Sequence, residues 1–253
     1  MNRIPRLVLI TALLMLGFLV PIAKGDTVVI GSNSNGSRYP FGMDPSSASS
    51  SFPDFVAGGV YQQVYAASAF SGPITITQIA FASSGTFTSG PGLANFNFNL
   101  GLSTSGAGPG SLSTDFASNR GADFSTVFSG PLNVSILDND QFDLIININP
   151  FTYDPANGNL LLDVSLNSTT IFSCGTQLYF LAGFDSNTSR VANPTGGTTA
   201  TVDDAFGLHT RFTTTTTTST STSTVPEPSA VLLFGTGFVG LVARIRKRFN
   251  RQR

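Results

Sequence analysis

The central part of the chain, residues 26–212, is predicted to fold as an all-β, antiparallel β-sandwich of jelly-roll type. Between residues 26 and 224 the chain contains no lysine and no glutamate, whereas Ser, Thr, Asn, Gly and Phe dominate. This composition disfavours helices and suits strands. Short runs in which apolar and small polar residues alternate recur along the region, and nothing of helical crossover length separates them. Antiparallel pairing is therefore expected.

The clearest strand is residues 95–102, where Phe96, Phe98, Leu100 and Leu102 alternate with small residues. This two-residue period predicts one face in a core and the other in water. Similar runs bring the expected total to about nine strands. They are residues 27–30, 59–66, 74–82, 124–128, 142–148, 160–166, 177–184 and 205–212. Gly-Pro and Asn-Gly turns are expected between them, including residues 71–73, 129–131 and 154–158.

Two irregular regions interrupt these runs, namely residues 44–54 and 103–121. Long loops on a sandwich often carry binding residues, but Gly and Ser in such numbers can equally make a loop simply mobile. Within the second loop, residues 112–119 are expected to form one or two helical turns.

The N-terminal segment has the pattern of a secretory signal peptide, assigned to residues 1–25. Arg3 and Arg6 precede an apolar run over residues 7–20, and Ala23 and Gly25 supply small residues before a cleavage point. The competing interpretation is an uncleaved membrane anchor. The signal peptide predicts that the body after residue 25 is exported.

That body is strongly acidic. Residues 26–224 hold thirteen aspartates and four arginines, a net charge of −9. The arginines are Arg38, Arg120, Arg190 and Arg211. A polyanion-binding surface needs clustered cations, so no nucleic-acid partner is expected.

The chain has one cysteine, Cys174, and one histidine, His209. No internal disulfide can form, and a small buried side chain is the default for Cys174, with a reactive thiol as the alternative. Every histidine-dependent triad would need His209, which lies in a strand-like run without a nucleophile elbow. Glycosidase-type carboxylate pairs also lack a recognisable motif. We therefore expect no catalysis, and a hydrolase is the least favoured function.

Two other chemistries remain open for the body. Asp138, Asp140 and Asp143 form the densest cluster of oxygen ligands, which suits a structural calcium ion, although a turn before the next strand explains it equally well. Asp203 and Asp204 form a second acidic pair. No other cofactor is expected.

Sugar binding is the alternative function, because flat aromatic rings can stack on pyranose faces. The chain has no Trp, which leaves the tyrosines as platforms. They are Tyr39, Tyr61, Tyr65, Tyr153 and Tyr179.

Residues 213–224 consist of Thr and Ser alone. Such a tract buries no apolar surface, so it is expected to be an extended stalk. The tract is either a plain linker or a segment that is O-glycosylated on its hydroxyl groups.

The last segment, residues 225–253, has three parts. Pro226, Glu227 and Pro228 form a rigid triplet, and an uncharged membrane helix is assigned to residues 229–243. The basic tail, residues 244–253, begins with Arg244, Arg246, Lys247 and Arg248. The uncharged run within the assigned helix, residues 230–243, has fourteen residues and would rise only about 21 Å as a helix, less than the ~30 Å of a bilayer core. The cations nevertheless favour a membrane helix over a buried one, because they can lie among cytoplasmic headgroups.

This order of triplet, short helix and arginine-rich end resembles the PEP-CTERM sorting signal of bacterial exported proteins. The resemblance implies a membrane partner and processing by an exosortase, a membrane-embedded enzyme that recognises the triplet. It also implies a non-enzymatic surface or matrix protein linked to exopolysaccharide and biofilm. The body would lie outside the membrane and the tail in the cytoplasm, with release after processing as a further expectation. Residues 61–65, 121–124 and 153–164 look like segments of other domains that carry this anchor. The body is expected to fold as a monomer.

Overall fold

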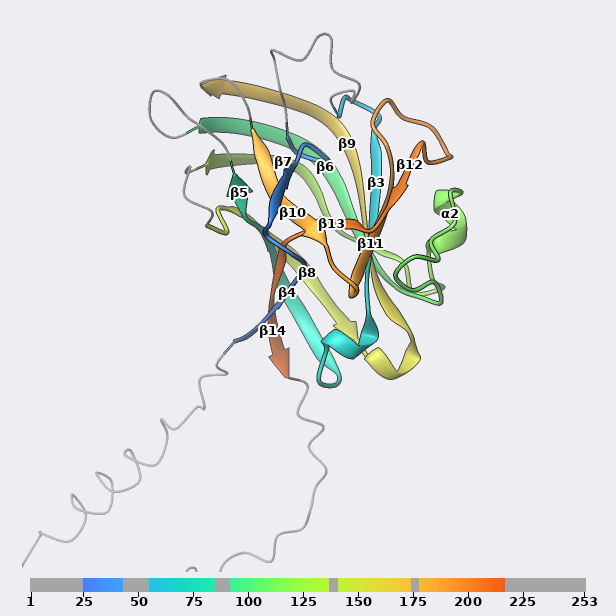
Figure 1. The fold of residues 1–253 in the computed structure, drawn as a ribbon. Helices are drawn as coiled ribbons and strands as arrows, with labels where there is room; N and C mark the ends of the chain where they lie inside the picture. The colour runs from blue at the N-terminus through green and yellow to red at the C-terminus, as the bar shows by residue number, and fades with distance from the viewer. Residues whose placement is uncertain (1–24, 43–54, 85–91, 137–140, 174–177, 217–253) are drawn as a thin grey trace, which may run out of the picture. The chain divides into compact units, whose positions relative to one another are not determined.

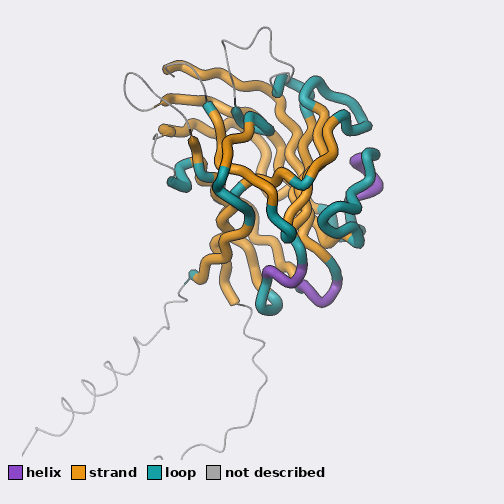
Figure 2. The backbone as a smooth tube through the Cα atoms, in the orientation of Figure 1, coloured by secondary structure: helices purple, strands orange, loops and turns teal. Residues whose placement is uncertain are grey.

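The computed structural model describes residues 25–42, 55–84, 92–136, 141–173 and 178–216, and their strands are all paired in antiparallel fashion (Figure 1). Strands dominate, and the helical parts are single turns (Figure 2). These turns are η1 (Ala67–Ala69), α2 (Phe116–Asn119) and η2 (Pro155–Asn157). The described residues belong to one compact unit. The predicted all-β class is confirmed.

The largest sheet has six strands in the order β12-β11-β3-β9-β6-β7. Their bounds are Val202–Asp204 (β12), Thr188–Asn193 (β11), Val60–Tyr65 (β3), Asn159–Ser173 (β9), Gly92–Ser105 (β6) and Ser125–Ile136 (β7). β6 and β9 are the longest strands and pair along most of their length. They therefore form the platform against which the other strands pack.

Two smaller sheets complete the fold. The β14 sheet has the order β1-β14-β4-β8, with bounds Asp26–Ile30, Thr210–Thr216, Ile74–Phe81 and Leu144–Tyr153. The β10 sheet has the order β13-β10-β2, with bounds Phe206–Leu208, Tyr179–Phe184 and Asn35–Ser37, and β5 (Ser83–Ser84) also pairs with β10. A jelly roll has eight strands in two Greek keys, so this division gives the jelly-roll part of the prediction no support.

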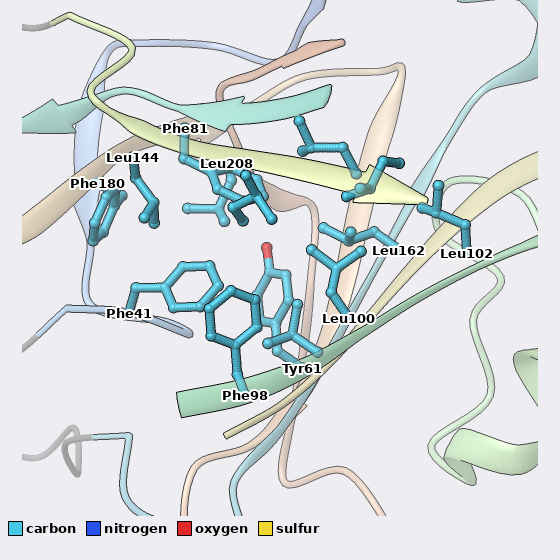
Figure 3. Close-up of a cluster of buried hydrophobic side chains, with 14 of the residues drawn as sticks. Phe41, Tyr61, Phe81, Phe98, Leu100, Leu102, Leu144, Leu162, Phe180 and Leu208 are labelled. Atoms are coloured by element: carbon cyan, nitrogen blue, oxygen red, sulfur yellow. The ribbon is translucent and has the colours of Figure 1, made fainter. Parts of the chain in front are cut away.

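The core lies between the six-stranded sheet and the two smaller sheets. In Figure 3, Phe98 and Leu100 of β6 point toward Phe81 of β4 and Leu208 of β13, and all four side chains are fully buried. Phe41, which follows β2, lies within this cluster, and its ring centroid is 5.1 Å from that of Phe98. Burying so many aromatic rings stabilises the packing of these layers against one another.

The strand predicted at residues 95–102 is confirmed and is longer than expected. The alternating residues from Phe96 to Leu102 are fully buried, as the period required. β7 corrects a neighbouring prediction, because the Gly-Pro turn expected at residues 129–131 lies inside this strand. Pro131 is tolerated because β7 is at the edge of the sheet, and Gly130 adopts a φ of 130°, which favours glycine.

The run predicted as one strand at residues 205–212 is instead divided between two sheets. β12, β13 and β14 follow one another with only Ala205 and His209 between them, yet each belongs to a different sheet. The backbone N–H of His209 donates to the carbonyl of Leu181, 2.8 Å away, so the crossing point is itself bonded to β10. This segment ties the three sheets together.

The Thr/Ser tract predicted as a stalk from residue 213 begins later than expected. β14 continues through Thr216 and pairs with β4 as far as Ile74. Thr214 is buried and donates to the carbonyl of Asp26. Threonine suits a pleated, half-buried surface, so the first four residues of the tract complete a sheet. The remaining residues of the predicted stalk lie outside the described part.

The loop predicted at residues 103–121 is held against the outer face of the six-stranded sheet. Leu112 and Phe116 pack on Val64, Leu161 and Val191 in a second, smaller apolar cluster. The one helical turn found here, α2, lies within the predicted residues 112–119.

A polar network fixes the same loop. The side-chain amide of Gln62 donates to the carbonyl of Phe116 and to Asp163, and Asn119 donates to Gln62 at 2.8 Å. Arg120 donates to the same Asp163 carboxylate at 2.8 Å. The interpretation of a merely mobile loop is therefore wrong for this region. The other predicted loop, residues 44–54, lies outside the described residues.

Candidate functional site

A pocket of about 360 Å³ opens where the β10 sheet meets the β11–β12 end of the six-stranded sheet. It is lined by Gly36, Ser37, Arg38, Tyr39, Tyr179, Phe184, Arg190, Asp204 and Phe206. These residues come from β2 and the turn after it, and from β10, β11, β12 and β13. The volume lies in the range of small-molecule pockets.

Arg190 forms the polar floor of this pocket. It is the cross-strand partner of Asp204, and two of its nitrogens donate to the Asp204 carboxylate at 2.7 and 3.1 Å. A third nitrogen donates to the Ser37 hydroxyl at 2.8 Å. The guanidinium also lies over the rings of Tyr39 and Phe206, at 5.4 and 5.0 Å from their centroids. Because its side chain is only 8% exposed, Arg190 presents a fixed planar group rather than a free charge.

The apolar rim is formed by a second cross-strand pair. Phe184 of β10 lies opposite Phe206 of β13, with ring centroids 5.2 Å apart in an edge-to-face arrangement. Phe184 is 71% exposed, and it is the one aromatic residue among the large exposed hydrophobic residues of the described ranges. An aromatic ring is thus held in solvent beside a fixed guanidinium–carboxylate pair.

The predicted sugar platforms need correction, because four of the five tyrosines are buried. Tyr61, Tyr65 and Tyr153 are in the core and cannot present a ring face to a ligand. Tyr39 lines the pocket but is only 4% exposed, with the Arg190 guanidinium over its ring, whereas Tyr179 is half-buried and also lines the pocket. Periodicity did not reveal the burial of Tyr61 and Tyr65, since their strand, β3, is covered on both faces.

Burial also changes the acidity of these phenols. Loss of hydration raises the pKa of Tyr61 well above its usual value of about 10, although the nearby Arg190 partly counteracts this. Burial raises the pKa of Tyr65 as well. Since the folded pKa exceeds the unfolded one, both phenols leave stability unchanged below pH ~10, and stability falls as pH rises above it.

We therefore expect Tyr61 and Tyr65 to ionise only when the domain unfolds. A spectrophotometric titration of the folded protein should leave part of the tyrosinate signal missing at pH ~11, and this part should appear together with loss of the β-sheet circular dichroism. Tyr65→Phe should reduce the delayed fraction, and protein in guanidinium, where all tyrosines titrate near pH ~10, is the control. A complete titration near pH ~10 with circular dichroism retained would contradict the burial of these side chains.

His209 has a structural position. Its Nδ1 lies 2.8 Å from the carbonyl oxygen of Gly31, and its ring stacks on that of Phe142 at 5.0 Å. It is not inside a continuous strand, as predicted, but at the crossing between β13 and β14. These contacts orient the imidazole toward the backbone.

Of the predicted calcium ligands, only Asp143 is described, and its carboxylate accepts a hydrogen bond from the Ser83 hydroxyl at 2.7 Å. Asp138, Asp140 and Cys174 lie outside the described ranges. Asp204 of the second acidic pair is bonded to Arg190, whereas Asp203 is exposed. Within the described ranges, no three His, Cys, Asp or Glu side chains come close enough to hold a metal ion.

The sorting residues predicted from the sequence also fall outside the described part. This applies to the signal segment before Gly25, to the triplet at residues 226–228, to the membrane helix at 229–243 and to the basic tail. In the part of the chain that is described, no helix combines the length and apolar character needed to cross a bilayer.

Comparison with known proteins assigns the C-terminal segment. Residues 224–247 match the family model of the PEP-CTERM protein-sorting motif. Neither a curated protein nor a solved structure matches the chain. The comparisons therefore characterise the C-terminal residues, and the fold of the body is known from its structure.

The molecule is therefore an antiparallel β protein that carries a sorting segment after its folded body. That segment is a PEP-CTERM protein-sorting motif, and such signals mark exported, membrane-anchored proteins of the cell envelope that exosortases recognise.

The sequence did not single out Phe184, Phe206 or Arg190 as a group. One available signal was the scarcity of arginine: of four in an acidic body, Arg38 and Arg190 both line the pocket. Arg38 and Arg190 line the same pocket because distant segments come together. Arg190 bonds to Ser37, which lies 153 positions away in the sequence and is the neighbour of Arg38.

Proposed function

We propose that this protein is a non-enzymatic surface or extracellular-matrix component, exported through residues 1–25 and held in the membrane by residues 229–243. An exosortase processes it at or near Pro226, Glu227 and Pro228. The β body lies outside the membrane and the basic tail in the cytoplasm, and the body associates with exopolysaccharide.

The match of residues 224–247 to the sorting motif carries this proposal. The charge distribution supports the orientation, because the tail holds six of the thirteen Lys and Arg residues of the chain. Cations retained on the cytoplasmic side prevent the tail from crossing. The acidic body carries no such barrier.

Two observations support a non-enzymatic role. The imidazole of His209 is committed to the Gly31 carbonyl and the Phe142 ring, and the guanidinium in the pocket is bonded to Asp204. With Nδ1 beside a backbone carbonyl and the ring stacked on Phe142, His209 has the surroundings of a structural residue, which favours a non-enzymatic role.

The proposal predicts a specific mature C-terminus. In a host with an exosortase, the native protein should be recovered from the envelope, and mass spectrometry should find a chain that ends near residues 225–228 instead of at Arg253. Glu227→Gln should leave the full-length chain, because the only glutamate of the protein lies between two prolines in the recognised triplet.

Deletion of residues 225–253 is a second test of the proposal and should release a soluble body. Asp203→Asn, a carboxylate change on an exposed residue of the body, is the matched control for Glu227→Gln and should not alter processing. A native chain that still ends in Arg253 in such a host, or a full-length product in the cytoplasm, would refute the proposal.

A further inference from the structure

The geometry points to a neutral-glycan site in the pocket between Phe184 and Arg190, in which a sugar ring stacks on Phe184 while its hydroxyls bond to the Arg190–Asp204 pair. This inference rests on the proposed association with exopolysaccharide and names the part of the body that would make the contact.

The exposed ring of Phe184 is the first argument. Its 71% exposure leaves most of a phenyl face in water, while its contact with Phe206 holds it in position. Burying that face against a ligand is favourable, at about 25 cal/mol per Å² of apolar surface. The C–H face of a pyranose offers a flat apolar surface of this kind, whereas its edge carries hydroxyls.

The polar groups match those hydroxyls. Asp204 is 33% exposed, so its carboxylate can accept from a ligand in addition to Arg190 and the backbone N–H of Phe206 at 2.9 Å. The bidentate pair with Arg190 fixes the carboxylate before a ligand arrives, which reduces the entropy lost on binding. Fixed donors and acceptors beside an aromatic platform suit a ligand with adjacent hydroxyl groups.

The charges favour a neutral ligand. Arg190 and Asp204 compensate each other, and although Arg38 also lines the pocket, the net charge of −9 on the body repels polyanions such as chains of uronic acids. A cationic ligand would meet the two arginines that line the pocket. The volume of about 360 Å³ suits one unit of a longer chain that leaves along the exposed rim at Phe184.

The test uses the full-length protein in mild detergent on an array of neutral hexose and pentose oligosaccharides beside oligomers of uronic acids. We expect binding to at least one neutral series, and calorimetry with the best oligomer should show binding weakened about tenfold or more by Phe184→Ala. Phe184→Tyr should retain affinity, because it keeps the ring. Leu93→Ala is the matched control, since Leu93 is an exposed hydrophobic residue on β6, and it should bind like the wild type.

Saturation-transfer NMR should place the sugar ring protons against aromatic protons in the wild type and not in Phe184→Ala. Binding to uronic-acid oligomers alone, to no glycan on the array, or with equal affinity after Phe184→Ala would overturn the assignment. Envelope fractionation and the mature C-terminus of Phe184→Ala should remain those of the wild type. A wild-type chain that binds a neutral glycan through Phe184 but is not processed in a host with an exosortase would instead count against the proposed function and leave the pocket assignment supported.

Discussion

Replacing Phe98 by alanine is expected to lower the free energy of unfolding by about 3–5 kcal/mol, because it removes a fully buried ring and leaves a cavity. The Phe98 ring lies 4.8 Å from that of Phe128 and 5.1 Å from that of Phe41, so three elements lose contact at once. The chain has no Trp, so urea unfolding of the full-length protein is best followed by far-ultraviolet circular dichroism.

Asn97→Ala is the control for this change. Asn97 is next to Phe98 on the same strand but faces outward, where its side-chain oxygen accepts from Asn167 at 3.2 Å. Loss of one such bond is expected to destabilise by about 1 kcal/mol or less. If Asn97→Ala proved the more damaging change, the strand would have the opposite face in the core.

Replacing Gln63 by leucine should be nearly as severe, although the two side chains are similar in size. Gln63 is fully buried and accepts from the hydroxyl of Tyr61 and from the backbone N–H of Leu208 at 2.7 Å. Its amide also donates to the Leu208 carbonyl at 3.1 Å. Each buried group left without a partner costs about 1–3 kcal/mol, so two such groups predict a loss of roughly 2–6 kcal/mol.

Gln78→Leu is the matched control, because Gln78 makes its bonds to Asn147 and Thr213 on a half-exposed face. Water can replace those partners, so the change in unfolding free energy should stay near about 0.5 kcal/mol. Hydrogen exchange gives a second measure: Gln63→Leu should speed exchange in β13 more than in β6. Equal stabilities for the two variants would show that the Gln63 bonds contribute nothing to holding β13.

Several elements were predictable because local patterns determine them. The alternation from Phe96 to Leu102 predicted a strand and its buried face, and the structure agrees. The turn at residues 154–158 was also predicted, and Asp154 there accepts from the N–H of Ala156 at 2.9 Å, as Asp does in such turns. Both the strand and the turn are determined by residues that are neighbours in the sequence.

Other predictions failed where packing from a second side decides the outcome. Alternation cannot show that β3 is covered on both faces, by the core around Tyr61 and by the loop that carries Phe116, so the tyrosines looked available for ligands. In the same way, Gly130 and Pro131 suggested a turn, and only the edge position of β7 lets them stay within a strand.

The sequence by itself determined the all-β class, the outward and inward faces of β6, and the family of the C-terminal segment, because composition, a two-residue period and a contiguous motif are local properties. Only the tertiary structure decided that residues 202–216 cross three sheets and that Phe184 lies in the rim of a pocket with Arg190. The physical reason is that these arrangements depend on contacts between segments far apart in the chain. Gln63 and Leu208, for example, are 145 positions apart, and no local pattern encodes which of many β partners a strand will take.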